Sequence, residues 1–199
     1  MNFTLPKFVS LCHCDPTELI TELDKKLNPK GKGHDYYWAL RKAVTSYIED
    51  EKEEAITDIL NSPSKEDERR YNKAAYAVFL KRFGKKKKTL EIVNHSEIYP
   101  VPQHGIEISV SPWFSTIEGG VTHLHVVWPY SKPKLLQRNA NIGNSVFEKS
   151  FTSSRYGNSQ FCIMDLVGDK RFTNKTVSPK TEMAFDSVCA SIRRESQKL

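Results

Sequence analysis

Residues 113–128 read WFSTIEGGVTHLHVVW, and this stretch decides the fold. Two runs rich in β-branched and aromatic residues, 113–117 and 121–128, lie on either side of Gly119 and Gly120. Such runs are typical of β-strands, and a pair of glycines between them is typical of a tight hairpin turn. We therefore expect an antiparallel hairpin here, as the first unit of a sheet.

Further strands are expected on both sides of this hairpin. The segments with the same β-branched and aromatic texture are 90–93, 105–110 and 161–167. Gly168 and Asp169 follow the last of these and predict a second turn, which leads to Arg171 and Phe172. The carboxy-terminal half is therefore expected to contain a sheet that is mostly antiparallel.

Two helices are predicted in the same half of the chain. One spans about 134–149, and the other begins at Ser178 and Pro179, where the serine can cap the helix and the proline suits its first turn. Strands and helices do not alternate regularly, which favours an α+β fold over a doubly wound one. We expect both helices to lie on one side of the sheet.

The amino-terminal half shows the spacing of amphipathic helices instead. Asp15, Pro16 and Glu18 predict the start of a helix that ends before Asn28. A longer helical pattern covers about 35–60 and is interrupted by the acidic stretch 49–54, and a third runs from Ser64 to Gly84. We therefore divide the chain into a helical region, 1–84, and an α+β region, 85–199.

Composition limits the class of protein. Of 199 residues, 38% are hydrophobic and 27% charged, which is typical of a folded globular chain. No stretch is apolar for the roughly 20 residues that span a bilayer, and the first residues lack a signal peptide's apolar core. We expect a cytoplasmic protein with no membrane partner, whose four cysteines stay reduced thiols.

The run KRFGKKKK at 81–88 is the most distinctive local feature. Its cations are Lys81, Arg82, Lys85, Lys86, Lys87 and Lys88. Such a cluster attracts phosphates, which predicts binding to nucleic acid or to an acidic protein. The alternative is a solvated linker whose charges complement the carboxy-terminal end of a helix. The formal net charge of +6 permits an acidic partner without demanding one.

The pair His123 and His125 is the candidate catalytic site. Residues two apart on a strand point to the same side, so the pair supplies half of a metal site or a facial triad. Glu107 lies about 20 Å away along its strand at 3.4 Å per residue, while Asp165 or Glu97 would need a neighbouring strand. The alternative is a polar, half-exposed strand face.

Three weaker features complete the set of candidate sites. The loop 30–33, of sequence KGKG, precedes a helix and resembles an anion-binding turn, but it lacks the rest of a nucleotide-binding loop. Cys12, His13 and Cys14 have no second ligand pair, so buried or idle thiols are favoured over metal. Tyr130 lies in a proline-containing turn with Lys132 and Lys134, a combination that suits single-stranded nucleic acid or an ordinary loop.

Three hypotheses about function follow. The first is a non-enzymatic binding or adaptor module that contacts nucleic acid or an acidic protein through 81–88 and needs no cofactor. The second is a metal-dependent hydrolase that acts on phosphoesters with His123 and His125. The third is a structural subunit that uses the acidic stretch 49–54 for a protein contact. The sequence indicates neither the oligomeric state nor whether the protein is an enzyme.

Overall fold

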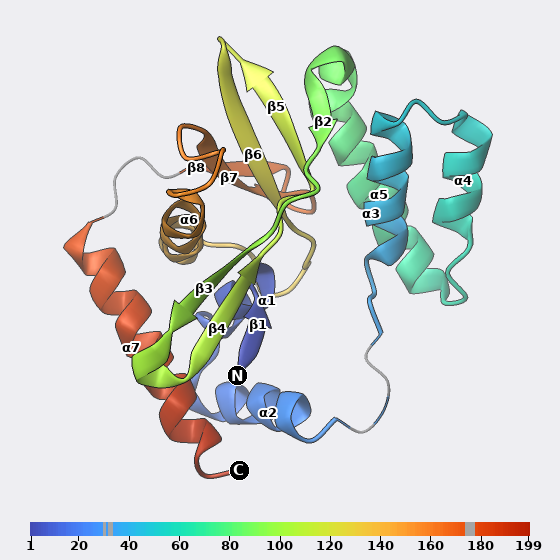
Figure 1. Cartoon of the computed structure of the whole chain (residues 1–199). Coiled ribbons are helices and arrows are strands. Elements are labelled where there is room, and N and C mark those ends of the chain that lie inside the picture. The colour runs from blue at the N-terminus through green and yellow to red at the C-terminus, as the bar shows by residue number, and fades with distance from the viewer. Residues whose placement is uncertain (30, 32–33, 174–177) are drawn as a thin grey trace.

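The computed structural model describes residues 1–29, 31, 34–173 and 178–199. Its fold is α+β, as predicted, with two mixed sheets and with helices on both sides of the larger one (Figure 1). The five-stranded sheet has the order β2-β5-β6-β7-β8, and the three-stranded sheet has the order β1-β4-β3. Within the described ranges, none of the helices has the length and apolar character needed to cross a membrane.

The hairpin expected at 113–128 is present and forms the middle of the larger sheet. Strands β5 (Phe114–Glu118) and β6 (Val121–Trp128) pair antiparallel. The turn contains two residues, Gly119 and Gly120, with φ of 58° and 79°, a left-handed conformation that glycine adopts without steric cost. The two-residue loop places Thr116 opposite His123 and Phe114 opposite His125.

The rest of the larger sheet contains antiparallel pairs and one parallel pair. Strand β2 (Leu90–Ile92) lies antiparallel to β5, and β8 (Lys170–Thr173) lies antiparallel to β7 (Gln160–Asp165). The predicted turn at Gly168 and Asp169 joins β7 to β8. Strand β7 runs parallel to β6 because helix α6 (Gln137–Phe151) crosses over between them.

The smaller sheet contains two strands that the sequence analysis did not predict. Strand β4 (Ile106–Val110) pairs with β3 (Glu97–Val101) and with β1 (Asn2–Thr4). Three residues are too few to show the alternation of a strand, and Pro100 interrupts β3, which lies at the sheet edge where proline is tolerated. Thr4 then caps the short helix α1 (Leu5–Leu11), also unpredicted.

Helix α2 (Pro16–Leu27) begins with the expected capping box, in which Asp15 and Glu18 bond to each other's backbone N–H. The pattern at 35–60 forms two helices, α3 (Trp38–Ile48) and α4 (Glu53–Asn61). The chain reverses between them at Asp50, whose φ is 65°, so the acidic stretch is a turn between helices.

Helix α5 (Glu66–Phe83) ends where expected, and the lysine run continues as the 3-10 helix η1 (Gly84–Thr89). Helix α7 (Pro179–Ser196) begins with Ser178 as its cap, as predicted.

The helices cover both faces of the larger sheet, and the two helices predicted in the carboxy-terminal half, α6 and α7, lie on the same side, as expected. Helices α1, α6 and α7 pack into a first core with residues such as Leu124 and Val126. Helices α3, α4 and α5 pack into a second core with Phe114 and Val127 on the opposite face (Figure 1). Neighbouring residues of β6 point to opposite faces and thus supply both cores. The division of the chain at residue 84 stays a prediction.

Candidate functional site

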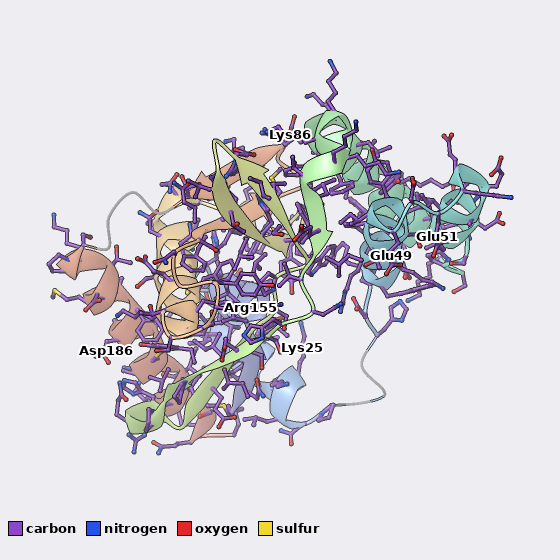
Figure 2. The ribbon with its side chains drawn as sticks, turned by 45° about the horizontal axis from the view of Figure 1, so that its top comes forward. Lys25, Glu49, Glu51, Lys86, Arg155 and Asp186 are labelled. Carbon is purple, nitrogen blue, oxygen red and sulfur yellow. The ribbon has the colours of Figure 1, made fainter. Side chains whose placement is uncertain are left out.

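The lysine run is folded onto the protein body. Segment η1 joins α5 to β2 at the end of the molecule away from α2 (Figure 1), and Figure 2 shows Lys86 at this outer end. Four of the six predicted cations form ion pairs: Lys81 and Arg82 with Asp169, Lys86 with Glu118, and Lys87 with Asp50. Lys87 also lies 4.7 Å from the centre of the Tyr47 ring. The segment is therefore a fixed structural element.

Two carboxylates each bind two cations. Asp169 accepts hydrogen bonds from Lys81, at 2.7 Å, and from Arg82. Glu118 accepts from Lys86 at one oxygen and from Arg171 at the other, each at 2.9 Å. One unit of positive charge thus remains in each group after pairing, so the carboxylates hold the cations in place without neutralising them.

The electrostatics of these carboxylates agree with that arrangement. Partial burial opposes ionisation of Glu118, but the hydrogen bonds from Arg171 and Lys86 lower its pKa to about 2. Hydrogen bonds from Lys81 and Arg82 likewise lower the pKa of Asp169. Both groups are therefore negatively charged at neutral pH.

The surface around these pairs carries more cations. Lys85, Lys88 and Lys170 are exposed, and none forms an ion pair with a residue that the structure describes. We call the whole surface the basic end. It comprises Lys81, Arg82, Lys85, Lys86, Lys87, Lys88, Lys170 and Arg171. A hollow of about 550 Å³ opens within it, with Arg82, Lys170 and Arg171 in its walls.

His123 borders the basic end and is almost completely buried. Its Nδ1 accepts a hydrogen bond from Arg171, whose Nε lies 3.3 Å from the sulfur of Cys162. Burial and the adjacent guanidinium lower the pKa of His123. Burial raises the pKa of Cys162, although Arg171 opposes this effect. A neutral imidazole and a neutral thiol at pH 7 therefore serve to position Arg171.

His125 is buried in the second core. Its side chain stacks on the Phe114 ring, with centroids 4.7 Å apart, and Phe83 covers it from α5. Its Nε2 lies 2.9 Å from the hydroxyl of Thr116. Burial, followed by the charge of Arg171, lowers the pKa of His125 to about 3. The ring is neutral and has no access to solvent.

The structure separates the carboxylates that might have joined the histidine pair. Asp165 pairs with Trp128 at the opposite end of β6 from His123, and Glu97 bonds to His95 in the smaller sheet. Glu107 lies in β4, opposite Asn2 and Pro100. Across residues 1–29, 31, 34–173 and 178–199, no three His, Cys, Asp or Glu side chains gather as metal ligands. The catalytic assignment of His123 and His125 stays a prediction.

The weaker candidates lie elsewhere. Cys12 and Cys14 donate to backbone carbonyls of α1, and Cys162 and Cys189 are buried, so all four are free cysteines. Of the loop 30–33, for which an ordinary connection between helices was favoured over an anion-binding turn, Lys30, Lys32 and Gly33 lie outside the described residues.

Sequence analysis missed the residues that organise the basic end. Glu118, Asp169 and Arg171 are far apart in the chain, and β7 and β8 bring Arg171 to the β5–β6 turn. Glu118 precedes one predicted glycine turn, Asp169 belongs to the other, and Arg171 follows it closely. Such turns lie at the ends of a sheet, and this was the available signal.

Comparisons with known proteins give the fold alone. No protein-family model matches the chain, and no curated protein matches it. Among solved structures, the chain is similar to one from Eubacterium rectale described as "Putative exonuclease", with a TM-score of 0.52 and 10% sequence identity. The match covers 100% of this chain and 81% of the other. At this identity the likeness concerns the arrangement of elements.

Proposed function

We propose that the protein binds nucleic acid without catalysing a reaction, and that the basic end contacts the phosphate backbone. The observation that carries the proposal is the sharing of Asp169 and Glu118 by two cations each. This arrangement fixes the side chains while leaving a surplus of positive charge at one end of the fold. Prepositioned cations lose less side-chain entropy when they meet a phosphate.

The exposed lysines would supply most of the binding free energy. Lys85, Lys88 and Lys170 extend from η1 and β8 without carboxylate partners among the described residues. Each lysine that neutralises a phosphate releases condensed counterions, which gives affinity a steep dependence on salt. The hollow beside Arg82 and Arg171 is also lined by Asp169, so a phosphate that entered it would contact the two guanidinium groups in competition with that carboxylate.

Acidic residues limit the direction of approach. Asp50 binds Lys87, and the exposed Glu49 and Glu51 lie beside it in the turn between α3 and α4 (Figure 2). A polyanion would be repelled there and would lie instead along η1 and the β5–β6 turn. The word exonuclease in the name of the similar structure agrees with nucleic acid as the polyanion, in preference to an acidic protein.

The test measures the binding of fluorescent single-stranded and double-stranded oligonucleotides by anisotropy over a range of salt concentrations. The Lys85→Gln, Lys88→Gln double variant should bind more weakly. The slope of its log affinity against log salt concentration should become less steep by about 0.7 to 0.9 for each lysine removed. Neither lysine has an ion pair in the described chain, so the fold should survive both changes. The matched control is Lys26→Gln, Lys180→Gln, which removes two exposed lysines from α2 and α7.

Two results would contradict the proposal. One is the absence of binding at low salt, and the other is an equal loss of affinity in the test and control variants. If the protein instead binds an acidic polypeptide such as polyglutamate and no oligonucleotide, the basic end serves a protein partner.

The word exonuclease agrees equally with the hydrolase alternative, but the geometry of the two histidines gives that alternative no support. His125 is enclosed by Phe83 and Phe114, and His123 is bonded to Arg171. A general base must reach the proton that it abstracts, and the His125 ring is shielded from solvent.

A further inference from the structure

A second hollow of the described structure lies beside helix α2. Its volume is about 690 Å³, and its walls come from α1, α2 and the loop that follows β6. The volume falls within the range of about 300 to 1,000 Å³ that is typical of small-molecule pockets. Neither of the histidines predicted as catalytic lines it. We call it the α2 pocket.

The loop side of the α2 pocket carries an aromatic ring in a fixed orientation. Tyr130 meets Trp128 at an interplanar angle of 87° with centroids 4.9 Å apart, and it meets Tyr37 at 76° with centroids 5.8 Å apart. These two nearly perpendicular contacts hold the ring in place. Burial, with the charges of Asp35 and Glu22, raises the pKa of Tyr130, so its hydroxyl stays protonated. A planar aromatic ligand would find a preformed platform here.

The helical side supplies hydrogen-bond acceptors. Glu18, Thr17, Thr21 and Glu22 line it from α2. Thr21 donates its own hydroxyl proton to the carbonyl of Thr17, which leaves its oxygen free to accept. Sugar hydroxyls and exocyclic amines are donors that suit such a wall.

The charges of the pocket are unevenly placed. Lys7 is paired with Glu22, and Lys25 binds the other oxygen of that carboxylate at 2.7 Å. Lys132, in the loop wall, is exposed and has no ion pair within the described ranges. Burial and Arg138 lower the pKa of His13, while burial raises that of Cys14, so both are neutral at pH 7. Lys132 is therefore the cation available to an anionic group.

We infer that the α2 pocket binds a nucleotide, with the base against Tyr130, the donor groups toward α2 and a phosphate beside Lys132. The combination of an aromatic platform, an acceptor wall and one free cation matches the three chemical parts of that ligand. This site is independent of the backbone contact proposed for the basic end. The ligand is either a free nucleotide or the terminal nucleotide of a single strand.

The test titrates AMP, adenosine and ribose 5-phosphate into the intact protein and follows binding by calorimetry and by the fluorescence of Trp128 and its neighbours. AMP should bind most tightly, adenosine more weakly, and ribose 5-phosphate least. Lys132→Gln should lower the affinity for AMP by about two- to five-fold, as expected for the loss of one exposed ion pair, and should leave the affinity for adenosine unchanged. Lys134→Gln is the matched control, because Lys134 is an exposed cation of the same loop that does not line the pocket.

A second variant examines the aromatic platform. Tyr130→Leu should weaken both AMP and adenosine by about five-fold or more, since stacking contributes to both. Its melting curve shows whether the variant is folded. Tyr130→Phe keeps the ring and should bind AMP within about two-fold of the native protein. Loss of binding in both variants would mean that the ring face is not what the ligand contacts, and it would overturn the inference.

Competition then identifies the source of the nucleotide. If AMP displaces a short oligonucleotide from the Lys85→Gln, Lys88→Gln protein, the pocket holds the end of a single strand; if it binds without displacement, the ligand is a free nucleotide. Either result supports a nucleotide site. Absence of any response to AMP at millimolar concentration, or ribose 5-phosphate binding as tightly as AMP, would refute it. If the oligonucleotide experiment shows that the basic end does not bind nucleic acid, AMP should still bind to the α2 pocket, so the two proposals can fail separately.

Discussion

The ammonium group of Lys86 lies 2.9 Å from one oxygen of Glu118 and joins the 3-10 segment η1 to the β5–β6 turn. The other oxygen of the same carboxylate binds Arg171 of β8. Three segments distant in sequence are thereby fastened at one point. Glu118 is thus a structural link as well as a charge within the basic end.

Replacing that carboxylate should change the stability of the protein to acid. The pKa of Glu118 falls from 4.5 to about 2 on folding, so its stabilisation is complete above pH 4.5 and disappears as pH falls toward 2. Glu118→Gln should lower the free energy of unfolding by about 1 kcal/mol at pH 7, a value reduced by solvent screening, with little difference near pH 2. Urea denaturation at several pH values measures this, with Glu91→Gln as a control on an exposed strand glutamate. An equal effect of both variants would contradict the assignment.

The buried ring of His125 should make the protein sensitive to mild acid. Its pKa falls from 6.5 in the unfolded chain to about 3 in the fold, so the unfolded state takes up the proton first. Its contribution to stability is complete above pH 6.5 and declines below it, by up to about 1.4 kcal/mol per pH unit. In the His125→Gln variant, the free energy of unfolding should depend less on pH between pH 6.5 and 4.5, a range in which Glu118 is still ionised. Comparison with His123→Gln separates the two rings, and an unchanged slope would show that His125 does not titrate this way.

Helix α6 packs so closely on its neighbours that one methyl group should disrupt it. A Cβ at Gly143 would lie 2.6 Å from a methyl of Ile163 and 2.7 Å from one of Val9. Gly143→Ala should destabilise the fold by about 1 to 3 kcal/mol through overpacking. Gly84→Ala is the matched control: the φ of Gly84 is −56°, the nearest atom to an added Cβ is 3.6 Å away, and alanine should be neutral or stabilising by about 0.5 to 1 kcal/mol. Thermal denaturation distinguishes the two, and equal melting temperatures would refute this account of the packing.

Removing a carboxylate from the basic end should strengthen nucleic-acid binding. Asp169 has a φ of 50°, a conformation that asparagine tolerates, so Asp169→Asn should keep the turn while releasing Lys81 and Arg82. We expect affinity for an oligonucleotide to rise by about two- to five-fold at low salt, because net charge governs the association. Anisotropy titration measures it. A fall in affinity would indicate that the ion pairs, and not the surplus of charge, are what nucleic acid requires.

The parts of the fold that depend on local signals could be predicted from the sequence. The glycine pair at 119–120 predicts a tight hairpin turn, although a loop of two or of three residues was possible, and the structure has the two-residue loop that places Thr116 opposite His123. Asp15 and Pro16 likewise define the start of α2. Such features rest on interactions between residues only a few positions apart.

Long-range pairing could not be predicted in the same way. The parallel pairing of β1 with β4 and of β6 with β7 depends on the face of the sheet over which the connecting chain passes. Local sequence patterns do not indicate this route. Periodicity indicated that His123 and His125 share a face, but Phe83 of α5 determines that His125 is enclosed. The same reasoning explains the ion pairs of the lysine run, since Asp50 and Glu118 approach it only through tertiary packing.

Strand β6 lies in the middle of its sheet and contributes Val126 to one hydrophobic core and Val127 to the other. A disturbance that displaces this strand therefore loosens the contacts on both of its faces at once. Neither layer of helices can melt while the other keeps its support, so the described chain should unfold in a single cooperative transition. The wall of the α2 pocket that follows β6 and the basic end beside β5 would then be lost together.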